Sequence, residues 1–182
     1  HNDRHERNFN ELPTPFLCIA TDIETGKQIV LDHGYLAQAI MASATFPSLF
    51  SPIVIDDKLL IDGGVVNNYP IDEVKKLGAD IIIGVDVQSG LKSRQELNNA
   101  TRILVQISNL QMMDNMEAKK ERTDIYIEAG ISEYSVISFS DGVEIIKKGE
   151  EASFVVYEKI KALGTNYSKP KLGLCEGKMD TL

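Results

Sequence analysis

One aspartate in the segment "LLIDGGVVNNYP" has the neighbours that a reactive carboxylate requires. Asp62 follows an apolar run at 59–61 and precedes Gly63 and Gly64. A carboxylate is normally a weak base, but an apolar pocket with few hydrogen-bond donors raises its pKa and allows it to accept a proton from a hydroxyl. The alternative is a plain tight turn, because Asp-Gly is a common hairpin signal. The segment taken alone is compatible with both interpretations.

The residues after Asp62 are predicted to shape the loop or the substrate pocket. Gly63 and Gly64 carry no side chains, which allows a sharp backbone turn and leaves room for an acyl ester beside the carboxylate. Asn67 and Asn68 are predicted either to orient the loop or to cap a helix that begins at Pro70. A structural role is favoured for both asparagines.

Two other aspartates end apolar strands, where open α/β sheets tend to place ligand sites. Asp22 and Asp86, together with Asp62, define an alternative, a metal-dependent phosphohydrolase. His33 is interpreted as a turn residue, and the chain has neither the grouped ligand spacings of a zinc site nor a glycine-rich phosphate loop. We therefore expect no metal and no cofactor.

Composition excludes one class of partner. The 182 residues carry a net charge of -8, and nucleic-acid affinity depends mostly on lysine and arginine, so nucleic acid is not an expected partner.

No apolar run reaches the roughly 18 residues that a membrane helix requires. Cys18 and Cys175 lack the close spacing of a metal or redox motif and are expected to be thiols.

The alternation of strand and helix patterns predicts a three-layer α/β/α fold with a mostly parallel, mixed sheet. Apolar runs and turn residues predict strands at 16–23, 28–34, 80–87 and 124–129, a strand–turn–strand unit at 50–64, and helices at 35–44, 70–77, 93–122 and 143–163. The run at 80–87 is expected to be covered on both faces. The domain should extend over 15–164, after an extended lead-in at 1–14 and before a tail or linker at 165–182.

An ordered set of motifs resembles the patatin-like phospholipase family, over about residues 12–163. The set is "LAQAIMASATFPSLFSP", then a hairpin into "IDGG", then the helix start "NNYP". The resemblance implies a lipid acyl hydrolase with a Ser-Asp dyad, in which Asp62 matches the aspartate. It also implies a serine in a Gly-x-Ser-x-Gly elbow and a glycine-rich oxyanion loop, both upstream of the aspartate motif.

The chain departs from this pattern because it contains no Gly-x-Ser-x-Gly. Ser43 and Ser48 precede Asp62 by fewer than 20 residues, but neither is predicted on a strand-to-helix elbow. We therefore expect the C-terminal part of a patatin-like catalytic domain that is inactive alone and exposes apolar surface, which would favour dimers or strand-edge pairing. The rival hypothesis is a non-catalytic α/β binding or regulatory module.

The stretch at 123–153 resembles the bacterial branch of the family, in which further modules of an outer-membrane secretion type follow the hydrolase domain. This resemblance implies additional C-terminal modules in the parent protein and a place at the bacterial cell envelope. The expected substrate is a lipid or an ester.

Overall fold

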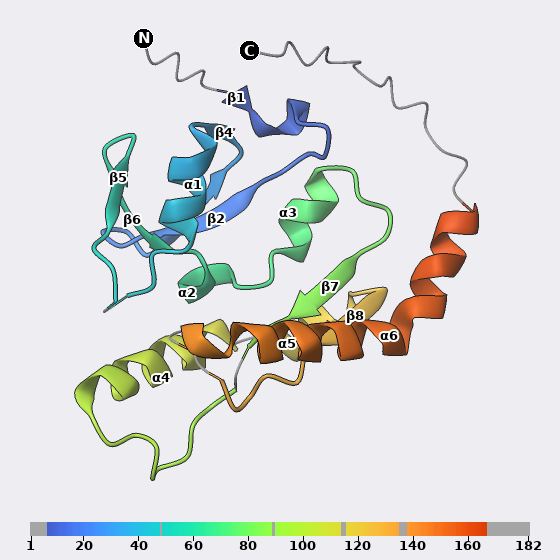
Figure 1. Cartoon of the computed structure of the whole chain (residues 1–182). Helices are drawn as coiled ribbons and strands as arrows, with labels where there is room; N and C mark the ends of the chain where they lie inside the picture. Colours follow the sequence, from blue (N-terminus) through green and yellow to red (C-terminus); the bar gives the residue numbers. More distant parts are fainter. Residues whose placement is uncertain (1–6, 48, 89, 114–115, 135–137, 167–182) are drawn as a thin grey trace, which may run out of the picture.

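Antiparallel hairpins form most of the larger sheet (Figure 1). The computed structural model describes residues 7–47, 49–88, 90–113, 116–134 and 138–166. Strands β2 and β3 pair through a tight turn in which Gly26 has a positive φ of 67°. Strand β6 pairs with β2 on one side and with β5 on the other, which gives the order β3-β2-β6-β5. The predicted strands at 16–23 and 28–34 thus pair as a hairpin, and the predicted strand–turn–strand unit at 50–64 is confirmed.

Along the chain, the described elements are β1 (Arg7–Asn8), η1 (Phe9–Glu11), β2 (Cys18–Asp22), β3 (Lys27–Leu31), β4 (His33–Gly34), α1 (Leu36–Ser43), β5 (Ile53–Ile55), β6 (Lys58–Asp62), α2 (Gly64–Asn67), α3 (Ile71–Lys76), β7 (Ile83–Asp86), α4 (Ala100–Met112), α5 (Met116–Glu121), β8 (Ile125–Glu128), η2 (Phe139–Asp141) and α6 (Gly142–Asn166).

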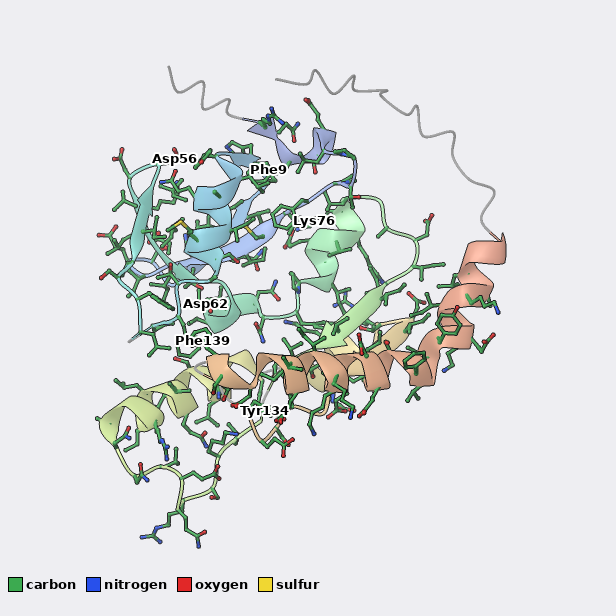
Figure 2. All side chains as sticks on the ribbon, in the orientation of Figure 1. Phe9, Asp56, Asp62, Lys76, Tyr134 and Phe139 are labelled. Carbon is green, nitrogen blue, oxygen red and sulfur yellow. The ribbon has the colours of Figure 1, made fainter. Side chains whose placement is uncertain are left out.

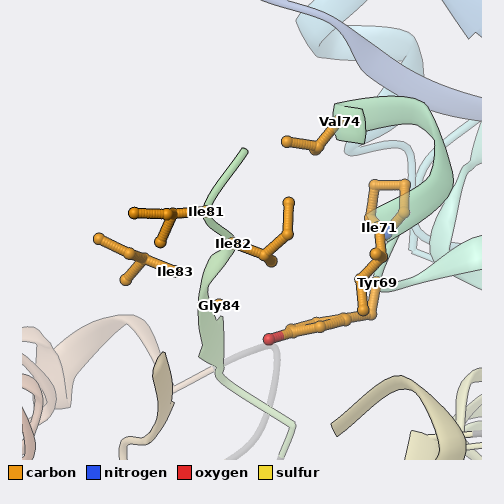
Figure 3. A pocket seen from close by; sticks show the side chains of 8 residues that line it. Tyr69, Ile71, Val74, Ile81, Ile82, Ile83 and Gly84 are labelled. Carbon is orange, nitrogen blue, oxygen red and sulfur yellow. The ribbon is translucent and has the colours of Figure 1, made fainter. Parts of the chain in front are cut away.

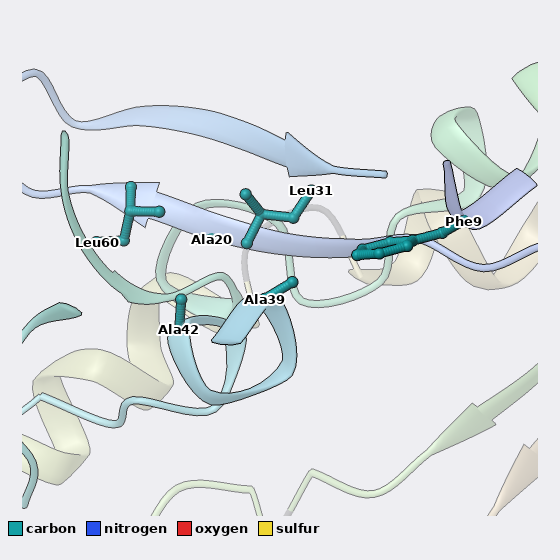
Figure 4. Packing of buried hydrophobic residues seen from close by; sticks show 6 residues of the cluster. All are labelled: Phe9, Ala20, Leu31, Ala39, Ala42 and Leu60. Atoms are coloured by element: carbon teal, nitrogen blue, oxygen red, sulfur yellow. The ribbon is translucent and has the colours of Figure 1, made fainter. Parts of the chain in front are cut away.

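The main core lies between the four-stranded sheet and helix α1 (Figure 4). Ala39 and Ala42 of α1 are small and buried, so the helix approaches the sheet closely and covers the fully buried Leu60 of β6. Phe9 is also fully buried in this cluster. The prediction of an unpacked lead-in is therefore wrong for this residue, which belongs to the short helix η1; residues 1–6 lie outside the described residues.

The second region is built on two parallel strands, β7 and β8, which pair from Ile83↔Ile125 to Asp86↔Glu128. Helix α6 packs on β8, and one stripe of its residues is partly buried: Ile145, Ala152, Val156, Ile160 and Leu163. Side chains of β7 remain open, since Ile83 is 46% and Val85 54% exposed. The prediction that this strand is covered on both faces is wrong for the described residues.

The α/β class is confirmed, but the predicted mostly parallel three-layer sheet is wrong for the described residues. Their strands form several small sheets, and β7 with β8 is the one parallel pair among them. Tight turns impose antiparallel pairing on neighbouring strands, whereas the parallel pair needs the long crossover through α4 and α5. The alternating pattern of strands and helices did not distinguish these two kinds of connection.

Helix α4 begins later than predicted. The side-chain oxygen of Asn99 accepts a hydrogen bond of 2.9 Å from the Arg102 N–H, which is the geometry of a helix N-cap. Before it, Glu96 accepts from both the N–H and the hydroxyl of Ser93. These local bonds compete with helix over the 93–99 stretch, so the single helix predicted at 93–122 appears as α4 and α5.

The remaining predicted elements agree with the structure. Helices α1, α3 and α6 and strand β8 occur where the sequence places them, and Gly78, with φ of 92°, follows the end of α3. None of the described helices is both long enough and apolar enough to cross a membrane. Helix α6 ends at Asn166, and the rest of the predicted tail lies outside the described residues.

Candidate active site

Asp62 lies where strand β6 meets helix α2 (Figure 2). Its backbone is held on two sides. The Asp62 N–H donates a 2.9 Å hydrogen bond to the carbonyl of Thr45, and the Thr21 hydroxyl donates a 2.8 Å bond to the Asp62 carbonyl. Both Thr21 and Thr45 are buried. The strand end that carries the carboxylate is therefore fixed by the sheet and by the segment after α1.

The two glycines are required by close packing rather than by an unusual backbone conformation. Gly63 has φ of -67°, which any residue adopts, but a Cβ there would lie 2.0 Å from the carbonyl oxygen of Ile19. A Cβ at Gly64 would lie 2.6 Å from the Asn68 Oδ1 and 3.0 Å from the Asp62 Oδ1. At both glycines, the position of a Cβ is therefore already occupied by neighbouring atoms.

The Asp62 carboxylate is half-buried and receives one hydrogen bond from the described residues. The Gly64 N–H donates to its Oδ1 at 2.7 Å. Burial raises the pKa of the Asp62 carboxyl above its usual range, and the Gly64 N–H opposes that rise without cancelling it. A carboxylate in this state is a better proton acceptor than one exposed to water.

Asn67 and Asn68 have different roles. The Asn67 side chain accepts a 2.9 Å bond from the Lys119 ammonium and donates a 2.7 Å bond to the Gln28 side-chain oxygen. Asn68 is the C-cap residue of α2, and its side chain lies over Gly64. Helix α3 has Pro70 as its N-cap residue, without a side-chain capping bond. Of the two alternatives, the structure supports loop orientation rather than capping.

Ser43 contacts the aspartate segment through its backbone and uses its hydroxyl elsewhere. Ser43 is the last residue of α1, and its carbonyl accepts a 3.4 Å bond from the Gly63 N–H. Its hydroxyl bonds to the thiol of Cys18. Burial raises the pKa of this thiol, and the Ser43 bond opposes the rise. Ser48 lies outside the described residues.

The other two aspartates have separate local partners. Asp22 accepts hydrogen bonds from the Thr25 hydroxyl at 2.7 Å and the Glu24 N–H at 3.1 Å, and the Thr25 bond lowers the pKa of Asp22. Asp86 accepts from the Tyr126 hydroxyl and from a backbone N–H. The described residues contain no group of three side chains placed to bind a metal ion. His33 contacts Asp32 at the surface.

An apolar cavity of about 340 Å³ lies between α3 and β7 (Figure 3). Tyr69, Ile71 and Val74 line one side, and residues 81–84 line the other. The Tyr69 ring covers Gly84, where a Cβ would lie 1.3 Å from the phenol oxygen. Asp62 is not among the lining residues, so the carboxylate and the cavity are separate features.

Sequence reasoning missed Gln28 and Lys119, which contact Asn67. They come from β3 and α5, about 40 residues before and 50 after Asn67. Neither residue carries a local pattern that signals such a contact. The sequence offered only their polarity, which is typical of solvated surface residues.

Comparison with known proteins places the aspartate segment in a family. The sequence profile of the patatin-like phospholipases matches residues 6–75, which include Asp62 and the glycines. Over these residues the chain is similar to the patatin-like phospholipases. An uncharacterized NTE family protein of Mycobacterium bovis is 35% identical over 79 residues, which cover 43% of this chain and 22% of the relative.

Fungal family members are similar over a longer stretch of the chain. A lysophospholipase of Pyricularia oryzae is 25% identical over 174 residues, and one of Aspergillus fumigatus is 26% identical over 175 residues. Each alignment covers 82% of this patatin-like chain but 12% of the relative. The chain therefore spans less than a quarter of the length of these relatives.

Proposed function

We propose that this chain supplies the aspartate of a Ser-Asp lipid acyl hydrolase, with Asp62 as the general base. The observation that carries the proposal is that the Asp62 carboxylate is half-buried and that burial raises its pKa. The residue lies at the end of strand β6, within the segment that matches the family profile. A serine hydroxyl is a weak nucleophile until a neighbouring base accepts its proton. Asp62 has the setting that such a base requires.

The reaction has two steps. Asp62 accepts the serine proton while the serine oxygen attacks the ester carbonyl, and the alcohol leaves with that proton from the carboxyl group. Water then cleaves the acyl-serine ester and regenerates both residues. The nucleophile and the oxyanion donors belong to a segment outside residues 1–182, because the chain has no Gly-x-Ser-x-Gly. This chain alone is accordingly not expected to turn over substrate.

The proposed substrate is a lysophospholipid or a related lipid ester. Support comes from the fungal relatives named as lysophospholipases. A hydrolase of this kind needs no metal, and the raised pKa of Asp62 serves the proton transfer directly.

The proposal includes self-association through exposed apolar surface. Large apolar side chains on two elements are at least 46% exposed. They are Ile83, Val85 and Val87 on the β7 segment and Val143, Ile146 and Phe154 on α6. Exposed apolar surface commonly marks an interface when its residues lie together. A second copy of the chain is the proposed occupant.

The experiment uses a protein in which this segment is joined to a serine elbow. Asp62→Asn keeps the size of the side chain but removes its basicity, so lysophospholipid hydrolysis should fall by about 10²–10⁴-fold. Labelling of the serine by a fluorophosphonate should fall with it. The matched control is Asp80→Asn, at an exposed position, which should leave turnover unchanged. Unchanged hydrolysis in Asp62→Asn removes Asp62 from the mechanism.

A further inference from the structure

A chain of side-chain hydrogen bonds connects helix α2 to three other elements. The Lys119 ammonium of α5 donates to the Asn67 Oδ1 at 2.9 Å. The Asn67 amide donates to the Gln28 Oε1 of β3 at 2.7 Å, and the Gln28 amide donates to the Glu73 Oε1 of α3 at 2.9 Å. We call these four residues the Asn67 relay.

The chemistry of its two ends fixes the direction of the Asn67 relay. An ammonium only donates hydrogen bonds, and an ionised carboxylate only accepts them. With Lys119 at one end and Glu73 at the other, each amide has one arrangement that satisfies both neighbours. Asn67 must present its oxygen to Lys119 and its NH₂ to Gln28. The relay therefore holds the Asn67 side chain in a single orientation.

Helix α2 depends on contacts of this kind because it has four residues. An isolated helix of that length is unstable, since nucleation fixes several dihedral angles for a single hydrogen bond. The Asn67 N–H closes the helix on the Gly63 carbonyl at 2.9 Å. At the start of the same turn, the Gly64 N–H donates to Asp62. Holding Asn67 thus holds the donor that faces the carboxylate.

We propose that Asn67 is a positioning residue for Asp62. Through the Asn67 relay, Asn67 keeps the Gly64 N–H directed at the Asp62 carboxylate. Its relevance to catalysis rests on the proposed function, but the positioning itself does not. The relay crosses from β3 to α5, so it fixes α2 against the sheet and against the segment that follows β7. Asn68, the C-cap residue of α2, is not one of the four residues of the relay.

Loss of the relay has a specific electrostatic consequence. Burial raises the pKa of Asp62, and the Gly64 N–H is the group that opposes the rise. When α2 loosens, this donor spends less time on the carboxylate, and the charged form loses its stabilising bond. The pKa of Asp62 should then rise further.

The test titrates individual carboxyl groups in this chain by carbon-13 NMR, with Asp62→Asn used to assign the Asp62 signal. Asn67→Leu and Gln28→Met both break the relay without changing the net charge. Each should move the titration midpoint of Asp62 to higher pH while the Asp22 midpoint stays in place. Asn10→Leu, at an exposed position outside the relay, is the matched control and should move neither midpoint.

An Asp62 midpoint that stays at the wild-type value in a folded Asn67→Leu or Gln28→Met protein overturns the proposal. So does unfolding of both variants, which would make the relay a general support of the fold. A moved midpoint together with full hydrolysis by Asp62→Asn in the longer protein would confirm the positioning and refute the proposed function. A fixed midpoint together with lost hydrolysis would give the opposite result.

Discussion

The two regions of the molecule differ in how completely they bury their apolar side chains. In the region of the four-stranded sheet, Leu60 of β6 and Phe9 of η1 are fully buried in one core cluster. In the parallel region, Val85 and Val87 are 54% and 61% exposed. The strands of a hairpin form their hydrogen bonds and bury one apolar face within a single stretch of chain. Parallel strands need connecting helices that cover both faces of the sheet. The aspartate segment belongs to the region that has the fully buried core residues.

The strongest test of this contrast removes a core side chain. Leu60→Ala leaves a cavity in the main core, and we expect the free energy of unfolding to fall by about 2–5 kcal/mol in urea denaturation. Ile146→Ser is the control from the second region, where the residue is 65% exposed, and should change it by about 0.5 kcal/mol or less. Equal losses in the two variants would contradict the comparison.

The Ile146→Ser variant also reports on self-association. Because the substitution removes exposed apolar surface, sedimentation velocity should show less association at high protein concentration than for the unmodified chain. Unchanged association would place the contact between copies elsewhere.

A glycine pair sharpens the contrast with a smaller effect. Gly63→Ala forces a Cβ against the Ile19 carbonyl, and overpacking of this kind costs about 1–3 kcal/mol. Gly149→Ala lies within α6, where a Cβ meets nothing within 4 Å, and should stabilise the chain by about 0.5–1 kcal/mol through helix propensity. Thermal unfolding should show a lower midpoint temperature for Gly63→Ala and a higher one for Gly149→Ala than for the unmodified chain. A neutral Gly63→Ala would mean that β2 and β6 can separate at low cost.

The smallest expected effect concerns pH. The pKa of Asp62 is raised in the folded state, so folding favours its protonated form, and stability is lost as pH rises from the unfolded pKa through the folded one. Asp62→Asn removes this penalty. The variant should therefore be more stable than the parent at neutral pH, with the gain disappearing at about pH 3. A gain that is equal at both pH values would exclude titration of Asp62 as its cause.

Local chemistry predicted most of the elements. Turn residues located the hairpins, and Gly78 located the end of α3, because these signals depend on neighbours in the sequence. The sequence also singled out Asp62, although its catalytic role stays a prediction. The extent of the parallel sheet was overestimated. An apolar run such as 80–87 indicates a strand that is suited to burial on both faces, but it does not show whether other elements cover those faces.

The environment of the candidate site was less predictable for a physical reason. Gln28, Asn67 and Lys119 meet through contacts between residues far apart in the chain, and no periodicity encodes them. The reason for Gly63 was likewise hidden, because the atom that excludes a side chain belongs to Ile19. Local sequence specifies backbone geometry, whereas exclusion of a side chain by a distant strand becomes visible only in three dimensions.

The contact between Tyr69 and Gly84 constrains how this sequence can vary. The phenol oxygen occupies the position that any β-carbon at 84 would need, so the two residues divide a fixed volume between them. Evolution can enlarge one only by shrinking the other. In an alignment of sufficiently many homologues, these two columns should covary in size, and an aromatic residue at 69 should coincide with glycine at 84.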